Sequence, residues 1–418
     1  MAVNKNFIGY RCTLCGQFFT PQEASFTCPI CGEKGILDVV YDYEKMKQEV
    51  NLDYFKNNKD YSMWRYAPMM SIETAHIKDM LRIGWTPLIK SNNLSKLLGL
   101  KTLYIKDDGL NPSGSSKDRA SGVGVLKALE VGADTIATSS TGNAASSLAC
   151  QAAHIGLKAV IFVPKRAPIG KVTQISLYGA TLIKVDGDYK DTFSFSKEAI
   201  KKYGWYNRNC AINPHLVEGK KTVSLEIAEQ LDFKPTDWVA VSVGDGCTVA
   251  GVYKGFYELK ELGLIKKVPR ILAVQSTGCE PFVIASHNQE PLKEAEENTI
   301  ADSISVGIPR NPIKALNAVK NSSGVWISVS DEEILNAETL LGRTEGVFAE
   351  PAAAASLAGV VKAVQEGIIP KEESVTFIVK GNGLKDPANA QKVIIPPSPM
   401  KPDLETLEKF LKQKEKEN

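Results

Sequence analysis

One lysine stands in a segment whose residue types suit covalent chemistry. Lys117 follows the turn-forming run Asn111-Pro-Ser-Gly114, and an apparent helix, Asp118–Leu129, begins directly after it. A strand-like run, Thr102–Lys106, precedes the turn. A lysine that acts as a nucleophile must lose its proton near neutral pH, so it needs a desolvated site or a cationic neighbour. Taken alone, Lys117 is better explained as a solvated lysine in a first helical turn, so the other segments must decide.

Two small-residue loops supply groups that bind anions. Ser140-Thr141-Gly142-Asn143 follows the apparent strand Thr135–Thr138 and offers hydroxyls, backbone N–H groups and a side-chain amide. Gly244-Asp245-Gly246-Cys247-Thr248 follows the apolar run Trp238–Val243 and precedes a helical pattern. A strand, a glycine turn and a helix N-terminus together aim N–H groups and the helix dipole at a phosphate. Each loop alone is a common connector, but the two loops in chain order with the lysine form a specific set.

In this order the motifs resemble the pyridoxal-phosphate enzymes of the tryptophan-synthase-β type, and within them the threonine synthases. The resemblance runs through nearly the whole chain, and so many ordered matches argue against chance. The further segments that carry it are Gly84–Leu88, Tyr178–Ala180, Glu218–Thr222, Glu345–Ala355 and Gly381–Asp386.

The resemblance implies a site and a reaction. Lys117 would hold pyridoxal phosphate as a Schiff base, and Asn143 would contact the oxygen on the cofactor ring. Gly244 to Thr248 would cradle the phosphate, Ser140 to Asn143 would bind the substrate carboxylate, and Lys380 takes the position beside the ring nitrogen. The implied carbon–oxygen lyase converts O-phosphohomoserine and water to threonine and phosphate. The cofactor serves as electron sink, so the protein supplies orientation, a base and placed charges.

Several positions depart from the threonine synthase pattern where the phosphate of the substrate is expected. In the stretch Cys210–Leu216 the two polar side chains that begin this segment in the family are absent, because Cys210 and Ala211 stand there. Leu216 stands where the family has an arginine. Leucine cannot make the charge-assisted contact of a guanidinium. Ala144 stands where a threonine is common. His215 or Lys220 could replace the missing cation.

Further departures lie near the expected cofactor. Lys380 replaces a threonine or serine, so either its amine faces the ring or the strand register turns it away. Asp245 replaces an asparagine in the phosphate loop, and it either points away or reports a substrate that carries an amine. Ser116 stands where a phenylalanine usually precedes the lysine.

These departures leave alternatives to the threonine synthase reaction open. One is a threonine-synthase-like paralogue that performs elimination or replacement on a non-phosphorylated amino acid, as a serine/threonine dehydratase or a β-substituting synthase does. Another is a non-enzymatic interaction protein on a degenerate enzyme body. The retained Lys117, Asn143 and glycine loop argue against the non-enzymatic alternative.

Four of the eight cysteines form two Cys-x-x-Cys pairs within the first 31 residues. They are Cys12, Cys15, Cys28 and Cys31, and each pair is followed by a glycine. Paired knuckles of this kind predict a zinc ribbon with thiolate ligands, and disulfides are the alternative. Some threonine synthases have a similar ribbon, and this resemblance implies a structural role. Cys150, Cys210, Cys247 and Cys279 are scattered, and buried small side chains are their default role, although Cys210 and Cys247 fall beside expected site residues.

Size and composition bound the remaining possibilities. The chain has 418 residues, 43% hydrophobic content and a net charge of +2, which fits two domains and gives no sign of a nucleic-acid partner. No apolar run reaches the length of a membrane span, and residues 1–8 lack the core of a signal peptide. We expect a cytoplasmic enzyme that acts on a small amino acid and forms a homodimer.

The pattern of elements predicts an α/β fold with parallel sheets after an N-terminal zinc ribbon, and the resemblance implies two such domains with the cofactor between them. Short β-rich runs alternate with helices from Gly84 onward, which is typical of parallel βαβ units. A final helix with leucines at helical spacing would dock on the body or on a partner subunit. The expected division is a ribbon at 1–45, a large domain at 46–118 and 206–395, a smaller mobile domain at 119–205 and a tail helix at 396–418.

Overall fold

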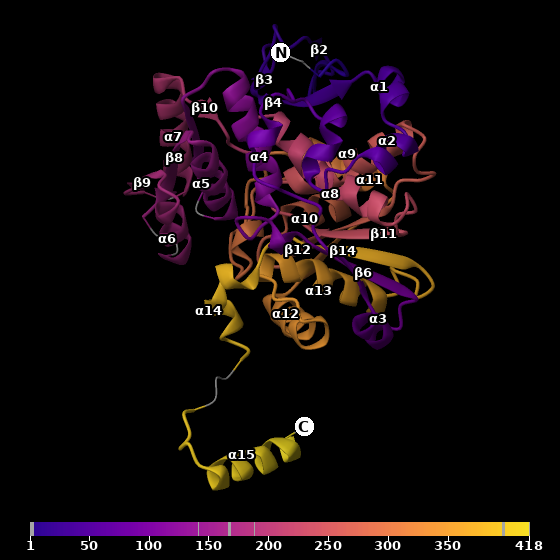
Figure 1. Cartoon of the computed structure of the whole chain (residues 1–418), viewed down its shortest axis with the longest axis vertical. Helices are drawn as coiled ribbons and strands as arrows, with labels where there is room; N and C mark the ends of the chain where they lie inside the picture. Colours follow the sequence, from indigo (N-terminus) through magenta and orange to yellow (C-terminus); the bar gives the residue numbers. More distant parts are fainter. Residues whose placement is uncertain (1–3, 141, 166–168, 188, 395–397, 418) are drawn as a thin grey trace.

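The computed structural model describes residues 4–140, 142–165, 169–187, 189–394 and 398–417, so Thr141 of the expected substrate loop lies outside the described residues. Figure 1 shows the ribbon at the top of the body, the smaller sheet with its helices on the left, and the larger sheet in the centre. The described part of the chain thus holds three sheets, one antiparallel and two with parallel strands.

The N-terminal sheet has the order β2-β1-β4-β3 and is antiparallel. Its strands are β1 (Phe7–Cys12), β2 (Phe18–Phe19), β3 (Thr27–Cys28) and β4 (Gly32–Tyr41). Leu37, Val39 and Tyr41 alternate along β4 and are buried, as expected for a strand with one face on a core. The chain continues through α1 (Tyr43–Glu49), α2 (Leu52–Asn57) and the 3-10 turns η1 (Met63–Met69) and η2 (Ile77–Asp79).

The largest sheet has six strands in the order β13-β12-β11-β14-β6-β5. It is parallel except at its edge, where β5 runs antiparallel to β6. Its strands are β5 (Leu88–Ser91), β6 (Thr102–Asp107), β11 (Trp238–Ser242), β12 (Arg270–Ser276), β13 (Val325–Val329) and β14 (Ser374–Val379).

Helices bury both faces of this sheet, as is usual for parallel strands. Along β11, Val239 and Val241 join one cluster of buried side chains and Ala240 joins the other. The first cluster includes side chains of α8 (His215–Gln230), α9 (Cys247–Glu261) and α11 (Pro312–Asn321). The second includes α3 (Asn93–Leu98), α12 (Asp331–Glu345) and α13 (Pro351–Gln365). The remaining helices near this sheet are α10 (Pro281–Asn288) and α14 (Pro387–Ala390).

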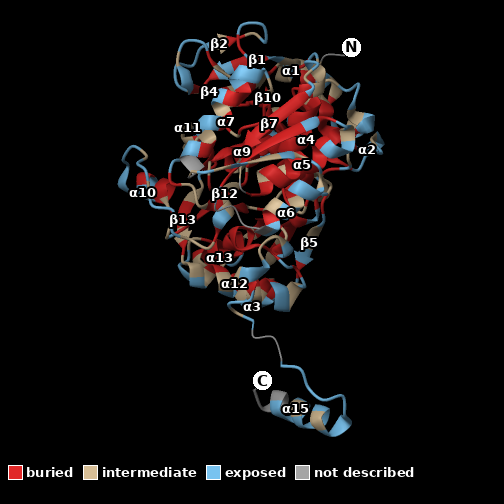
Figure 2. Cartoon of the chain, turned by 90° about the vertical axis from the view of Figure 1, so that its left-hand side faces the viewer, coloured by how far each residue is buried: buried red, intermediate tan, exposed pale blue. Residues whose placement is uncertain are grey.

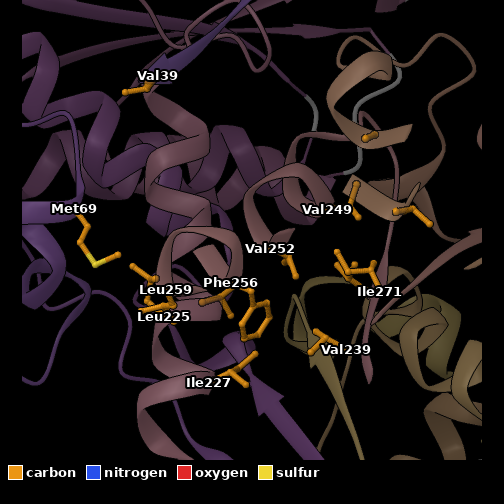
Figure 3. Packing of buried hydrophobic residues seen from close by; sticks show 14 of the residues in the cluster. Val39, Met69, Leu225, Ile227, Val239, Val249, Val252, Phe256, Leu259 and Ile271 are labelled. Carbon is orange, nitrogen blue, oxygen red and sulfur yellow. The ribbon is translucent and has the colours of Figure 1, made fainter. Parts of the chain in front are cut away.

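The ribbon shares the first of these clusters and is not a separate globule. Val39 from β4 and Met69 from η1 belong to the same packed cluster as Leu225, Phe256 and Ile271 (Figure 3). The strand β4 is therefore part of the core of the body.

The smaller parallel sheet has the order β10-β7-β8-β9. Its strands are β7 (Thr135–Ser139), β8 (Lys158–Pro164), β9 (Thr181–Val185) and β10 (Tyr206–Asn207). The helices of this region are α4 (Lys117–Glu130), α5 (Asn143–Ile155), α6 (Ile169–Leu177) and α7 (Tyr189–Tyr203). The division expected at residue 205 falls just before β10, the edge strand of this sheet.

The C-terminal helix α15 (Leu404–Glu417) lies apart from the body, and it is mostly exposed where Figure 2 colours its burial. Leu404 and Leu411 are exposed on it. Docking of this helix on the body, one of the two expectations for it, is therefore wrong; docking on a partner subunit stays a prediction. Across the described ranges, none of the helices has the length and apolar character that crossing a membrane requires.

A buried group of charges fixes the start of α4. Arg119 donates to Asp108 at 2.7 Å and to both carboxylate oxygens of Glu226 in α8. Lys106 on β6 donates to Glu226 Oε2 at 2.7 Å, and the four side chains are at most 1% exposed. Because Lys117 is two residues before Arg119, this ion pairing sets the position of the lysine as well.

We predict that Arg119→Met lowers the free energy of unfolding by about 3–5 kcal/mol, because it leaves the Asp108 carboxylate buried without its cation and leaves Glu226 with Lys106 alone. Denaturant unfolding followed by circular dichroism measures the change. Glu405→Gln on α15 removes an exposed partner of Lys409 and serves as the matched control, with no change expected. A loss below about 1 kcal/mol for Arg119→Met would contradict the structural role of the network.

Candidate active site

A cavity of about 970 Å³ is lined by residues that follow the carboxyl ends of β7, β10, β11 and β14. Ligands of open α/β sheets bind in such a crevice outside the carboxyl ends of the strands. The cavity collects the expected site residues that the structure describes, namely Lys117, Ser140, Gly142, Asn143, Gly244, Asp245, Gly246, Cys247, Thr248 and Lys380. The separate motifs of the sequence therefore meet at one place.

Lys117, the first residue of α4, meets both physical requirements of a nucleophilic lysine. Burial, followed by the positive charges of Lys220 and Arg208, lowers the pKa of Lys117 to about 8, against the opposing effect of Glu350. A substantial fraction of the amine is therefore neutral near pH 8.

Asn143 is held by a residue that the sequence analysis did not single out. Its Nδ2 donates to Glu350 Oε1 at 2.7 Å and to Ser303 Oγ at 3.4 Å. Glu350 precedes α13, and a Cβ on Gly381 would come within 2.3 Å of Glu350 Oε1, so that glycine allows the carboxylate to lie there. Among the described residues, the buried Oδ1 of Asn143 has no hydrogen-bond partner. A cofactor with polar groups on its ring fits this unsatisfied amide.

The glycine loop before α9 has the geometry of a phosphate cradle. Gly246 has φ +84° and a Cβ there would lie 2.8 Å from Asn311 O, while a Cβ on Gly244 would lie 3.0 Å from Ile304 Cα. Side chains at these positions would strain the backbone or collide with it. The loop leads into the N-terminus of α9, whose first N–H groups have no partner within the helix and attract anions.

Asp245 is neutralised by the protein itself. Its Oδ1 accepts from Arg310 Nη1 and from the Arg310 backbone N–H, each at 3.3 Å. Burial raises the pKa of the Asp245 carboxyl, and the Arg310 charge opposes that rise. A substrate amine is therefore not needed to explain this acid in the phosphate loop.

Lys380 follows β14 and lines the cavity, so the register that would turn it away is wrong. Its Nζ donates to the carbonyl oxygen of Ser242 at the end of β11. Burial, and then the charge of Lys117, hold the pKa of Lys380 well below its ordinary value. Burial thus favours the uncharged amine of Lys380, which can hydrogen-bond as the hydroxyl that it replaces does.

The two candidates for a replacement cation behave differently. His215 is buried between Tyr10 Oη at 3.0 Å and Ser71 Oγ at 2.6 Å, away from the cavity lining. Burial holds its pKa well below the ordinary value, so it is neutral. Lys220 does line the cavity, and its Nζ lies 3.2 Å from Cys210 Sγ.

Two further cations of the cavity were missed from the sequence. Arg208 follows β10, a strand of two residues that no apolar pattern indicates, and Arg310 precedes α11. Arg208 Nε and Nη2 donate to Ser121 Oγ at 3.2 and 3.0 Å. Leu216, which stands at the position of the family arginine, is fully buried and packs close to Gly124. The loss of that arginine therefore does not leave the cavity without positive charge.

The ribbon cysteines converge outside this cavity. The sulfurs of Cys12, Cys15, Cys28 and Cys31 all lie within 4.8 Å of one another, and Cys15 Sγ is 3.9 Å from Cys28 Sγ. Tetrahedral zinc with Zn–S bonds of about 2.3 Å separates its sulfurs by about 3.8 Å. The backbone N–H of Leu14 donates to Cys12 Sγ and that of Cys31 donates to Cys28 Sγ. The donor set thus fits a thiolate-bound metal.

The fold and the cavity define a class of protein that the comparisons identify. The family model described as pyridoxal-phosphate dependent enzyme matches residues 80–381. The chain belongs to this family. Solved structures support the fold: threonine deaminase isoform 2 from Solanum lycopersicum has a TM-score of 0.65 at 21% identity over 81% of this chain and 93% of that chain. Diaminopropionate ammonia lyase from Escherichia coli has a TM-score of 0.66 at 19% identity over 80% and 93%.

Within the family, curated relatives named threonine synthase resemble the chain over most of its length. The protein of Methanocaldococcus jannaschii is 38% identical over 96% of this chain and 99% of its own. That of Methanosarcina acetivorans is 40% identical over 90% of this chain and 92% of its own. The sequence-based recognition of a threonine-synthase-like, pyridoxal-phosphate-dependent enzyme is confirmed.

We predict that Lys117 is the lysine that binds the cofactor and that its uptake depends on pH. The rate at which apoprotein binds pyridoxal phosphate covalently should rise with pH and level off above about pH 8, because only the neutral amine attacks. Absorbance stopped-flow measures the rate, and borohydride reduction followed by peptide mapping locates the linkage. A label on Lys380 or Lys385, or full turnover by Lys117→Ala, would contradict the assignment.

We also predict a single zinc ion per chain on the four ribbon cysteines. Chelation should lower the melting temperature more than it changes the spectrum of bound cofactor, because the ribbon shares the core of the body while none of its four cysteines lines the cavity. Elemental analysis and thermal unfolding test this, with Cys12→Ser losing the metal and Cys279→Ser, a buried cysteine elsewhere, keeping it. A metal-free protein, or ribbon disulfides in reducing buffer, would count against it.

Proposed function

We propose that this enzyme converts O-phosphohomoserine and water to threonine and phosphate. The observation that carries the proposal is the meeting of Lys117 with three cationic side chains, Arg208, Lys220 and Arg310, in one cavity. A substrate with a carboxylate and a phosphate suits such a cavity, because both groups are anions. The relatives named threonine synthase support the same reaction.

Pyridoxal phosphate, bound by Lys117, Asn143 and the loop Gly244–Thr248, would supply an electron sink for negative charge on the substrate Cα. Lys117 Nζ would serve as the base that takes the Cα proton and returns a proton further along the substrate. Its lowered pKa places it in the range where it can both accept and donate a proton near neutral pH.

The N-terminus of α5 is the proposed site of the substrate carboxylate. Ser140 Oγ accepts from the backbone N–H of Gly142 at 3.2 Å, which holds the loop in place before the helix. The first N–H groups of α5 then serve the carboxylate without introducing a competing nucleophile. Asn143, the first residue of α5, donates a hydrogen bond to Glu350. This bond fixes the proposed carboxylate loop relative to the proposed cofactor site.

The proposed leaving phosphate meets Arg208, Lys220 or Arg310 in the cavity. Each is engaged by the protein: Arg208 by Ser121, Lys220 by Cys210 and Arg310 by Asp245. Such contacts hold a cation in place before an anion arrives, which lowers the entropy cost of binding. The ribbon has a structural role in this proposal, and the expected homodimer and cytoplasmic location stay predictions.

The second candidate is elimination or replacement on a non-phosphorylated amino acid. It is favoured by Ala144, Ala211 and Leu216, which remove polar side chains that threonine synthases usually have near the substrate phosphate. The two candidates differ in one measurable property, the dependence of turnover on the charge of the leaving group.

We predict that Arg208→Met lowers kcat/KM for O-phosphohomoserine by roughly 30- to 150-fold, the effect of about 2–3 kcal/mol for a lost charged hydrogen-bond set. Steady-state kinetics with serine, threonine and acylated homoserines provide the comparison. Their kcat/KM should change far less, because they carry no phosphate. Arg343→Met, an exposed arginine on α12, is the matched control. Efficient turnover of a neutral substrate alone would favour the second candidate and overturn the first.

A further inference from the structure

Two cysteines from separate elements meet at the wall of the cavity. Cys210 follows β10 and is half-buried, while Cys247 is the first residue of α9 and is buried. Both line the cavity, and Cys210 packs against the small buried cluster to which Cys247 belongs. Neither is one of the ribbon cysteines, and the proposed reaction uses the thiol of neither.

The surroundings of Cys210 favour its thiolate form. Lys220 Nζ lies 3.2 Å from Cys210 Sγ. The hydrogen bond from Cys247, together with the charges of Lys220 and Arg208, holds the pKa of the Cys210 thiol well below its ordinary value despite its burial. A cationic neighbour and a second cysteine in the same packed cluster are features of redox-active cysteines.

The two remaining cysteines of the body lack this environment. Burial raises the pKa of both Cys150 and Cys279. They behave as small buried side chains, as the sequence analysis expected, and they are internal controls for reactivity.

We propose that Cys210 and Cys247 are a redox-active dithiol in the cavity, which a peroxide converts to a disulfide that shuts down the site. The inference concerns the oxidation state of the protein and holds whichever amino acid is the substrate.

The chemistry balances with hydrogen peroxide as oxidant. The Cys210 thiolate attacks one peroxide oxygen and the O–O bond breaks, which leaves a sulfenic acid on Cys210 and, after protonation, one water. The sulfur of Cys247 then displaces the hydroxyl from Cys210, an S–S bond forms, and a second water leaves with the Cys247 proton. Two thiols give up two electrons to one peroxide, and an external thiol reverses the change.

The disulfide would act on the cofactor site through its position. Bond formation brings the sulfurs to about 2.05 Å and ties the segment after β10 to the first residue of α9. That residue belongs to the loop that cradles the phosphate. Lys220, which is buried, loses the sulfur anion beside it. We expect the affinity for pyridoxal phosphate to fall roughly tenfold or more.

The test treats the holoenzyme with hydrogen peroxide, then alkylates free thiols under denaturing conditions and maps the peptides by mass spectrometry. The expected product is a Cys210–Cys247 cross-linked peptide that dithiothreitol cleaves, formed while Cys150 and Cys279 remain free. Released cofactor, measured by absorbance after gel filtration, should increase in parallel. The same map follows the ribbon cysteines, so damage there is distinguished from the cavity disulfide.

Two cysteine variants separate the first oxidation step from formation of the disulfide. Cys247→Ser should stop at the sulfenic acid on Cys210, which dimedone traps, whereas Cys279→Ser should form the disulfide as the unaltered protein does. If the Cys247 variant fails to fold, the alkylation rate of Cys210 against Cys150 in the native unaltered enzyme decides instead. Equal rates for the two cysteines, or oxidised protein in which Cys210 and Cys247 stay unlinked, would overturn the proposal.

Discussion

The buried guanidinium of Arg119 is the constraint on which the cavity depends. It joins Asp108 at the end of β6 to Glu226 on α8 and thereby locks the first turn of α4. The helix α8 also carries Lys220, so one set of ion pairs fixes Lys117 and one of its cationic neighbours together. A lysine with a lowered pKa needs such rigidity, because a mobile amine would escape from the charges that perturb it.

A second set of contacts joins the regions that contribute to the cavity. Asn143, which lies after β7 of the smaller sheet, donates a hydrogen bond to Glu350. Lys171 on α6 forms an ion pair with Asp302 close to Gly142. Lys385 donates to Gln174 on α6 at 2.9 Å. These polar contacts lie beside the cavity, whereas away from it η1 and the smaller-sheet region share a buried apolar cluster that includes Met63, Val123 and Leu148. The contacts beside the cavity are the ones that can be exchanged for contacts with a ligand.

The sequence predicted the strands and the main site residues because both have local patterns. The runs Thr102–Lys106 and Trp238–Val243 match β6 and β11 to within one residue, and the glycine loop lies between a strand and a helix as expected. The missed residues have no local pattern. Glu350 and Arg208 become site residues only through tertiary contacts. Leu216 was expected to mark a missing phosphate contact, but helix α8 turns its side chain into the core. His215 failed as a cation because burial makes it neutral.

The shared core of ribbon and body has a consequence for the order in which the chain can fold during synthesis. Tyr41 on β4 hydrogen-bonds Glu218, 177 residues later in the chain. At a ribosomal rate of roughly 5–20 residues per second, β4 waits about 9–35 s for this partner. During that interval the apolar face of the strand has only local residues to cover it. The four cysteines, all between residues 12 and 31, are close enough in sequence to gather early, so a metal bound there would give the nascent ribbon its order before the body exists.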